Sequence, residues 1–180
     1  MLTTRTPLDR RDRDRDEPAT LTIEVGAATA TGVTEVAAFD AALRELGVGE
    51  ANVIRLSSVI PPRSQVRRAA RVGKPIEWGD RLYCVYALGH ATATGAATAA
   101  GIGWVQLTDG SGAGLFVEHH GESTGQVEEL IHASLTEMTA ARSGRFGPVR
   151  LATAQTRCTG RPACALVLAA YEAAGWERTS

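Results

Sequence analysis

Short apolar segments recur along this chain, and only two longer stretches have helical spacing. The segments have the length and aliphatic content of β-strands: 21–26, 51–60, 81–94, 101–107, 113–120, 149–158 and 163–176. The helical stretches do not alternate regularly with these segments. The pattern therefore predicts the α+β class, with a largely antiparallel or mixed sheet.

Each helical stretch has an apolar face and a stop signal. The first begins at Thr34 as a cap and ends at Gly47 or Gly49, whereas the second ends at Gly144. The expected apolar faces are Val36, Phe39, Leu43 and Leu46 in the first helix, and Val127, Leu130, Ile131, Leu135 and Met138 in the second.

Composition limits the kinds of partner. The chain has 180 residues, a length that suits one domain over residues 21–180, and its 19 basic and 20 acidic residues nearly balance. No general attraction to nucleic acid or to a membrane is therefore expected. Residues 1–20 alternate in charge, lack aromatics and are predicted to be a disordered tail. Without a signal peptide, a cytoplasmic location is expected.

Several familiar kinds of site are disfavoured. The glycine-rich stretch 89–103 lacks the spacing of a phosphate-binding loop, so nucleotide binding is not expected there. In Glu118-His119-His120, adjacent histidines on a strand face opposite sides, so no metal site is expected. Cys158 and Cys164 are spaced for a hairpin disulfide, but reduced thiols are expected in the cytosol.

The serine pair in "LSSVIPP" has two interpretations. One is a strand end before the Pro61-Pro62 turn. The other is self-cleavage: the Ser58 hydroxyl attacks the carbonyl of Ser57, and the peptide bond becomes an ester. Elimination then leaves dehydroalanine, whose hydrolysis releases ammonia and leaves a pyruvoyl group. This route needs a hydrogen-bond donor for the oxyanion.

Two segments decide between these interpretations. "FDAALRELGVGEANVIRLSSVIPP" and, more weakly, "GLFVEHHGE" resemble the pyruvoyl-dependent arginine decarboxylase family, and the likeness extends from about residue 21 to the C-terminus. The resemblance implies cleavage into a β chain, 1–57, and an α chain, 58–180, in which Ser58 supplies the covalent pyruvoyl cofactor. It also implies a four-layer αββα sandwich and a homotrimer with active sites between subunits.

The resemblance also assigns roles to individual residues. Asn52 matches the residue that assists cleavage, Glu118 the proton donor in turnover, and Asp40 the carboxylate that holds the substrate guanidinium. The remaining residues implied to line the substrate pocket are Leu43, Gly49, Ala51 and Ser57. If Glu118 is not the proton donor, His119 and Tyr83 are the next candidates. Asp40 has a second interpretation, as a solvated helix acid paired with Arg44 four residues later.

The reaction implied is conversion of L-arginine to agmatine and carbon dioxide, through an imine between the substrate amine and the pyruvoyl carbonyl. Decarboxylating an amino acid leaves a carbanion that requires an electron sink. Pyridoxal phosphate is not expected, because Lys74 is the only lysine and lies in a turn-like segment. Two alternatives remain: a pyruvoyl-dependent decarboxylase of another amino acid such as histidine, and an unprocessed relative that only binds an amine.

Overall fold

In the part of the chain that the structure describes, two helices and nine strands in two sheets make up the fold, which confirms the α+β class. The computed structural model describes residues 20–176, so most of the expected N-terminal tail lies outside the described residues. The elements in order are β1 (Leu21–Thr31), α1 (Glu35–Glu45), β2 (Asn52–Arg55), β3 (Val59–Ile60), β4 (Ser64–Arg68), β5 (Arg81–Ala91), β6 (Ala97–Gln106), β7 (Gly114–Gly121), α2 (Thr124–Ala140), β8 (Arg150–Arg157) and β9 (Ala163–Ala174).

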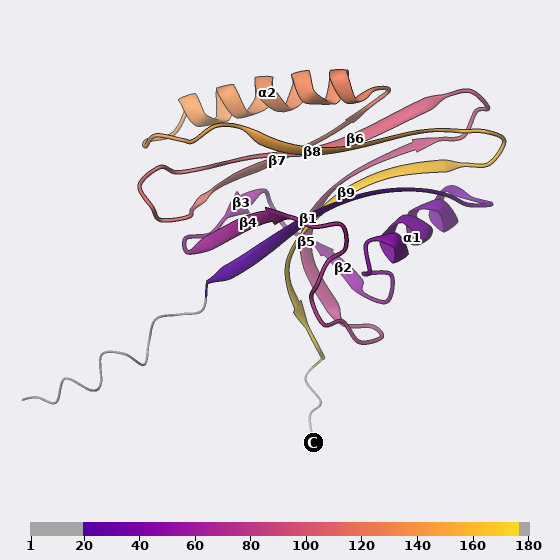
Figure 1. Ribbon diagram of the computed structural model, residues 1–180, viewed down its shortest axis with the longest axis horizontal. Helices are drawn as coiled ribbons and strands as arrows, with labels where there is room; N and C mark the ends of the chain where they lie inside the picture. The colour runs from indigo at the N-terminus through magenta and orange to yellow at the C-terminus, as the bar shows by residue number, and fades with distance from the viewer. Residues whose placement is uncertain (1–19, 177–180) are drawn as a thin grey trace, which may run out of the picture.

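The strand orders are β2-β5-β9-β1-β4 in one sheet and β3-β7-β6-β8 in the other (Figure 1). The five-stranded sheet is mixed, because β4 is parallel to β1 and β2 is parallel to β5. All pairs in the four-stranded sheet are antiparallel. The expectation of largely antiparallel or mixed sheets is therefore confirmed.

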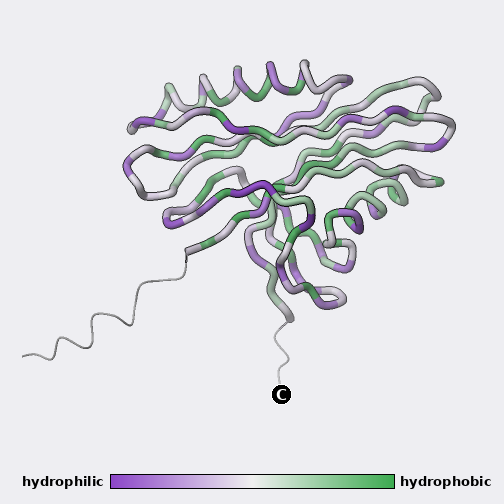
Figure 2. The backbone as a smooth tube through the Cα atoms, in the orientation of Figure 1, coloured by the Kyte–Doolittle hydropathy of each residue, from purple (hydrophilic) through white to green (hydrophobic). Residues whose placement is uncertain are grey.

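Three groups of buried side chains hold the elements together. The largest joins the two sheets and includes Ile23, Val85, Phe116 and Val167. A second group packs α1 on the five-stranded sheet, and a third packs α2 on the four-stranded sheet. Figure 2 shows hydrophobic residues along the strands where these elements meet. Each fully buried Ile, Leu or Phe in such a group stabilises the fold by about 1.5–3 kcal/mol.

The apolar run of β9 follows from its central place in the five-stranded sheet. Leu166 and Leu168 pack on the α1 side, whereas Ala165 and Val167 face the other sheet. Successive strand residues point to opposite faces, so a strand that is covered on both sides needs apolar residues at every position. Tyr171 lies on the inter-sheet side near the end of this run.

Two glycines in β6 let α2 lie close to the sheet. A Cβ atom added at Gly103 would lie 2.1 Å from Ile131 Cγ2, and one at Gly101 would lie 2.5 Å from Val127 Cγ1. Side chains at these positions would push the helix outward. This part of the glycine-rich stretch therefore serves helix packing.

The predicted helices form, with two corrections to their buried faces. Thr34 is the N-cap of α1 as expected, since its Oγ1 accepts a hydrogen bond of 3.1 Å from the amide of Ala37. Gly47, with φ +80°, follows the end of α1. Val36 and Leu130 were placed on the apolar faces, but they are 76% and 40% exposed. The buried residues are Ala38, Ala42 and Leu43 in α1 and Val127, Ile131 and Leu135 in α2, so the buried stripes are narrower than predicted.

The strand predicted over 51–60 is interrupted. Its first part, β2, pairs with β5 in one sheet, and its last part, β3, pairs with β7 in the other. Apolar pattern alone cannot locate such a break, because both parts keep strand character. The prediction of one continuous strand was wrong, and the chain crosses between the sheets at Leu56–Ser58.

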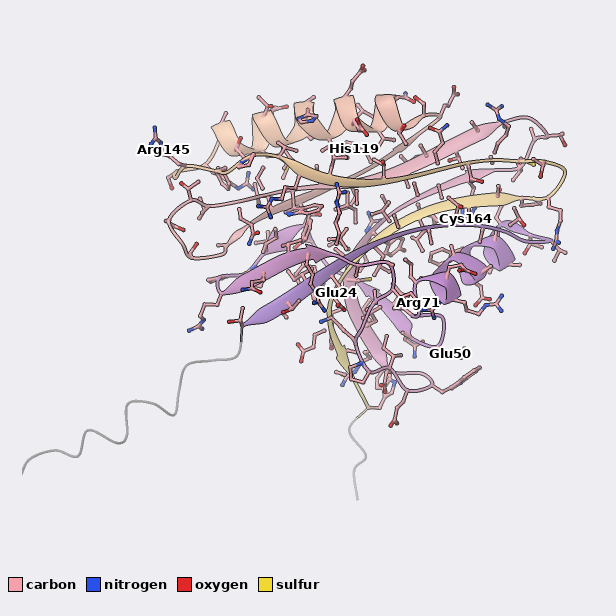
Figure 3. All side chains as sticks on the ribbon, in the orientation of Figure 1. Glu24, Glu50, Arg71, His119, Arg145 and Cys164 are labelled. Carbon is pink, nitrogen blue, oxygen red and sulfur yellow. The ribbon has the colours of Figure 1, made fainter. Side chains whose placement is uncertain are left out.

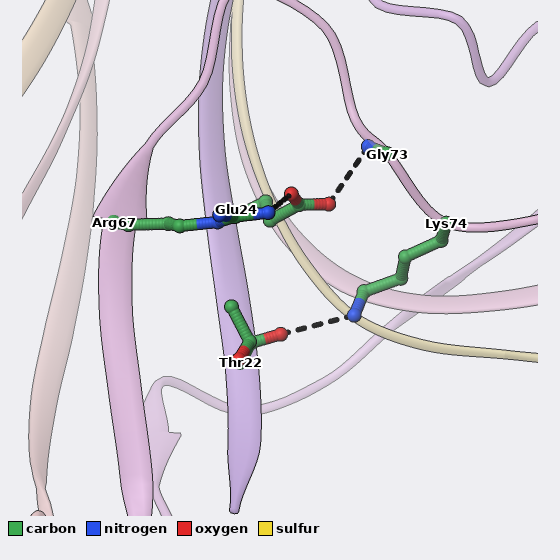
Figure 4. A network of polar contacts seen from close by, with 5 residues as sticks. All are labelled: Thr22, Glu24, Arg67, Gly73 and Lys74. Atoms are coloured by element: carbon green, nitrogen blue, oxygen red, sulfur yellow. Dashed lines mark hydrogen bonds and ion pairs between the residues drawn. The ribbon is translucent and has the colours of Figure 1, made fainter.

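Strand β4 was not predicted and is secured by a buried acid. The Glu24 carboxylate on β1 accepts hydrogen bonds from Arg67 on β4 and from the amide of Gly73, while Lys74 Nζ donates to the Thr22 carbonyl (Figure 4). Glu24 is 3% exposed. Burial opposes its ionisation, but the hydrogen bonds and the charges of Arg67 and Lys74 outweigh burial and lower its pKa.

Candidate functional site

The serine pair lies where the chain passes from one sheet to the other. The amide of Leu56 donates to the carbonyl of Cys84 on β5 at 2.8 Å, which ties the chain to the five-stranded sheet. Two residues later, the carbonyl of Ser58 accepts from the amide of Phe116 on β7 at 2.9 Å, in the four-stranded sheet. The Ser57–Ser58 bond therefore spans the two sheets, and Ser57 is exposed.

Glu118 faces Ser58 across this crossing. The Ser58 hydroxyl contacts both carboxylate oxygens, at 2.6 Å to Oε1 and 2.7 Å to Oε2. On β7, Phe116 faces the inter-sheet core while Leu115 and Val117 face α2, as the alternation predicts. Glu118 belongs to the same face as Phe116, and it lines a pocket of about 420 Å³ with residues that include Arg55, Tyr86 and His120.

Tyr171 is a second polar group at the crossing, and the sequence reasoning missed it. Its hydroxyl donates to the carbonyl of Val59 at 3.0 Å, and its ring packs edge-on against Phe116 with centroids 6.0 Å apart. Burial, and next the charge of Glu118, raise its pKa, so the hydroxyl remains a donor at neutral pH. A buried tyrosine hydroxyl generally needs a partner, but the sequence does not show which group supplies it.

A separate pocket of about 530 Å³ collects most of the expected substrate-binding residues. Asp40, Gly49, Ala51 and Asn52 line it, together with Arg44, Glu50, Trp78 and Gly79. The Asn52 amide donates to the Gly79 carbonyl at 2.6 Å. Trp78 was not predicted as a site residue, yet its indole is 87% exposed beside this pocket.

Asp40 forms an ion pair within this pocket. Its carboxylate lies 3.0 Å from Arg44 Nε, and both side chains are more than half exposed. Gly49 makes room for this arrangement, since a Cβ there would lie 2.3 Å from Arg44 Cγ. This contact is the i,i+4 pair with Arg44 that the second interpretation of Asp40 predicted. In it, the Asp40 carboxylate binds the guanidinium of Arg44. The carboxylate is thus oriented to bind such a group.

The structure does not bring all predicted residues into one place. Leu43 is buried beneath α1 among the residues that pack on the five-stranded sheet, and it does not line the Asp40 pocket. The Asp40 pocket and the Glu118 pocket share no lining residue. Within residues 20–176, no hydrogen bond connects Asn52 to Ser57 or Ser58.

His119 lies on the opposite side of β7 from Glu118. Its Nε2 is 2.8 Å from Ser134 Oγ on α2, and Figure 3 shows it beneath that helix. Burial lowers its pKa, as does the charge of His120, while Glu118 opposes the shift. This orientation makes His119 a poor substitute for Glu118 as a proton donor to a group at Ser58.

The described cysteines are free thiols, and burial raises the pKa of Cys164 to about 11 and that of Cys84 to about 12. Cys84 and Cys164 are therefore weak nucleophiles at neutral pH. Among residues 20–176, no cluster of three His, Cys, Asp or Glu side chains suits a metal ion. Neither described helix is long and apolar enough to cross a membrane.

Comparison with known proteins gives a consistent result. The sequence model of the pyruvoyl-dependent arginine decarboxylase family matches residues 20–174. Proteins of that name from Thermococcus kodakarensis and Thermococcus sibiricus are 30% and 32% identical to this chain, over 80% and 78% of its length and 90% and 87% of theirs. The Halobacterium salinarum protein of the same name is 36% identical, over 77% of this chain and 86% of its own.

Proposed function

Because the chain belongs to the pyruvoyl-dependent arginine decarboxylase family, we propose that it cleaves itself between Ser57 and Ser58 and then converts L-arginine to agmatine and carbon dioxide. The observation that carries the proposal is the contact of the Ser58 hydroxyl with Glu118 at the crossing between the sheets. It sets a nucleophile next to the bond to be cut and a carboxyl group beside the residue that becomes the cofactor.

The surroundings of residue 58 suit a pyruvoyl group. Such a group supplies a ketone carbonyl that condenses with a substrate amine and withdraws electrons as carbon dioxide leaves. The neighbouring amide oxygen, that of residue 58, accepts the hydrogen bond from Phe116, and this donor favours negative charge on the oxygen. Glu118 is the acid that we assign to returning a proton to the substrate carbon.

The Asp40 pocket supports arginine as the substrate. A carboxylate that already holds the guanidinium of Arg44 has the chemistry to hold the guanidinium of a ligand. A guanidinium presents several N–H donors in one plane, and histidine, the alternative substrate, lacks this group. Lys74, the only lysine in the chain, donates to the Thr22 carbonyl beside Glu24, and we assign it no catalytic role.

We propose that each active site combines two subunits, since the family implies a trimer and the pockets of Asp40 and Glu118 are separate. Co-expression of Asp40→Asn and Glu118→Gln tests this. If sites are shared, mixed oligomers contain some intact sites and regain activity that neither variant has alone. Activity no higher than that of the separate variants would place each site within one subunit.

Mass spectrometry of the intact protein tests the function itself. The wild type should give two chains, 1–57 and 58–180, the second lighter by one ammonia than a chain that begins with serine. Ser58→Ala should remain whole because the attacking hydroxyl is absent, whereas Ser57→Ala should still cleave. The processed protein should form agmatine from arginine. A wild-type chain that stays whole on prolonged incubation would refute the proposal and favour a non-catalytic relative.

A further inference from the structure

The backbone turns back on itself at Ser58. The amide of Val59 donates to the carbonyl of Ser57 at 2.9 Å, a hydrogen bond between residues two apart that defines a γ-turn centred on Ser58. Such turns occur at many strand ends, where the carbonyl has no chemical role. Here the acceptor belongs to the Ser57–Ser58 bond, the bond whose cleavage is proposed above.

Three further hydrogen bonds fix this turn. Leu56 is bound to Cys84 before it, the Ser58 carbonyl is bound by Phe116 within it, and the Val59 carbonyl is bound by Tyr171 after it. The acceptors and donors lie on β5, β7 and β9, so both sheets hold the segment. The direction of the Val59 amide is therefore set by the fold before any reaction begins.

We infer that the Val59 amide is the oxyanion donor for self-cleavage, an inference that rests on the proposed function. As the Ser58 Oγ–C bond to Ser57 forms, the carbonyl electron pair moves onto the Ser57 oxygen, which the Val59 amide contacts. The hydroxyl proton passes to the Glu118 carboxylate that already accepts it, or to water when that group is replaced. Collapse breaks the C–N bond, and the Ser58 nitrogen takes up a proton.

The geometry of Asn52 strengthens this assignment. The resemblance gives Asn52 a part in cleavage, but its side-chain amide is engaged by the Gly79 carbonyl at 2.6 Å. The donor that the structure places on the Ser57 oxygen is a backbone group. A donor of this kind is rigid and requires no rearrangement as charge develops, which is the condition for effective electrostatic stabilisation.

Replacing the Val59 amide tests the inference. Incorporating the α-hydroxy acid analogue of valine at position 59 turns the Ser58–Val59 peptide bond into an ester and so removes the Val59 N–H. Val59→Pro removes the same N–H by ordinary mutagenesis. Val59 lies on edge strand β3, where proline is tolerated, and the hydrogen bond from Phe116 on β7 goes to the carbonyl of residue 58, so it does not use the Val59 amide. Val59→Ala keeps the N–H and is the matched control.

The measurement is the rate at which freshly made precursor splits, followed by intact mass, with thermal melting to show that each variant is folded. Loss of one oxyanion donor should slow cleavage by about 10²–10³-fold in the ester and proline variants, with little change in Val59→Ala. An ester variant that splits at the wild-type rate would overturn the inference while leaving the proposed function intact. A wild-type chain that never splits would instead refute the proposed function.

Discussion

The Ser58 hydroxyl and the Glu118 carboxylate are in contact although 60 residues separate them in the sequence. Pairing of β3 with β7 brings them together, and the Ser58–Phe116 hydrogen bond fixes the register. Two roles are therefore open to Glu118, one before cleavage and one after it.

Glu118→Gln separates these roles. We expect the variant to split into two chains, because glutamine can still accept the hydroxyl hydrogen bond and water can take the proton. Turnover should fall at least about a hundredfold, the usual contribution of a general acid. Borohydride added with arginine should still attach the substrate mass to the longer chain. Wild-type turnover would exclude Glu118 as the proton donor, and a variant that stays whole would make it the base for cleavage.

Asp40→Asn tests recognition of the guanidinium. Loss of a charge-assisted hydrogen bond should lower kcat/KM for arginine by an amount that corresponds to about 2–3 kcal/mol of lost transition-state stabilisation. Self-cleavage should be unchanged. Steady-state agmatine formation by fully processed protein provides the measurement. Unchanged kinetics would restrict Asp40 to its ion pair with Arg44.

Arg44→Gln should act in the opposite direction. Arg44 competes with the substrate for the Asp40 carboxylate, and an exposed i,i+4 pair is worth about 0.3–0.5 kcal/mol. Removing it should lower KM for arginine about twofold, and the effect should shrink at high salt because exposed charges are screened. A higher KM would show that Arg44 assists binding instead.

Tyr171→Phe should slow self-cleavage several-fold, because the Val59 carbonyl loses the hydroxyl that holds the turn. The same change in the uncleaved Ser58→Ala background should lower the free energy of unfolding by about 1 kcal/mol. Tyr83→Phe on neighbouring β5 is the matched control and should leave cleavage unaffected. If cleavage keeps its wild-type rate in Tyr171→Phe, the hydrogen bond is structural only.

Glu24 predicts how stability depends on pH. Its folded-state pKa is lowered, so its contribution is present above the unfolded-state pKa, near 4.5, and is lost as the pH falls through the folded value. Glu24→Gln should therefore destabilise the protein by about 1–3 kcal/mol at pH 7, and the difference from wild type should narrow below pH 4.5. Urea unfolding of the wild type and of Glu24→Gln, from pH 7 to below pH 4.5, measures this difference in the free energy of unfolding. A difference that is independent of pH would assign the loss to packing.

Local chemistry made part of this structure predictable. Thr34 was identifiable as a cap, and the alternation of side chains along a strand explains why Phe116 faces away from Leu115 and Val117 on β7. The pairing of Ser58 with Glu118 came from resemblance, because contacts between distant strands leave no periodic signal. β4 was missed, since Arg67 and Arg68 give a short edge strand little strand character.

The turn at Ser58 cannot be read from the sequence either. Val53, Ile54, Val59 and Ile60 share the same aliphatic character, although the two pairs belong to different sheets. Only tertiary packing decides where the chain leaves the first sheet. The same limit applies to Tyr171, whose partner is a backbone carbonyl 112 residues away.

The crossing between the sheets also decides what a cut at Ser57–Ser58 leaves behind. No strand is severed: β1 stays zipped between β9 and β4, and β2 stays along β5. The two fragments therefore stay paired in one sheet, because the smaller fragment contributes the inner strand β1 and the larger fragment contributes β9 and β4 on either side of it. Cleavage breaks one peptide bond between the two sheets. The new chain ends remain hydrogen-bonded to different sheets, Leu56 to β5 and residue 58 to β7.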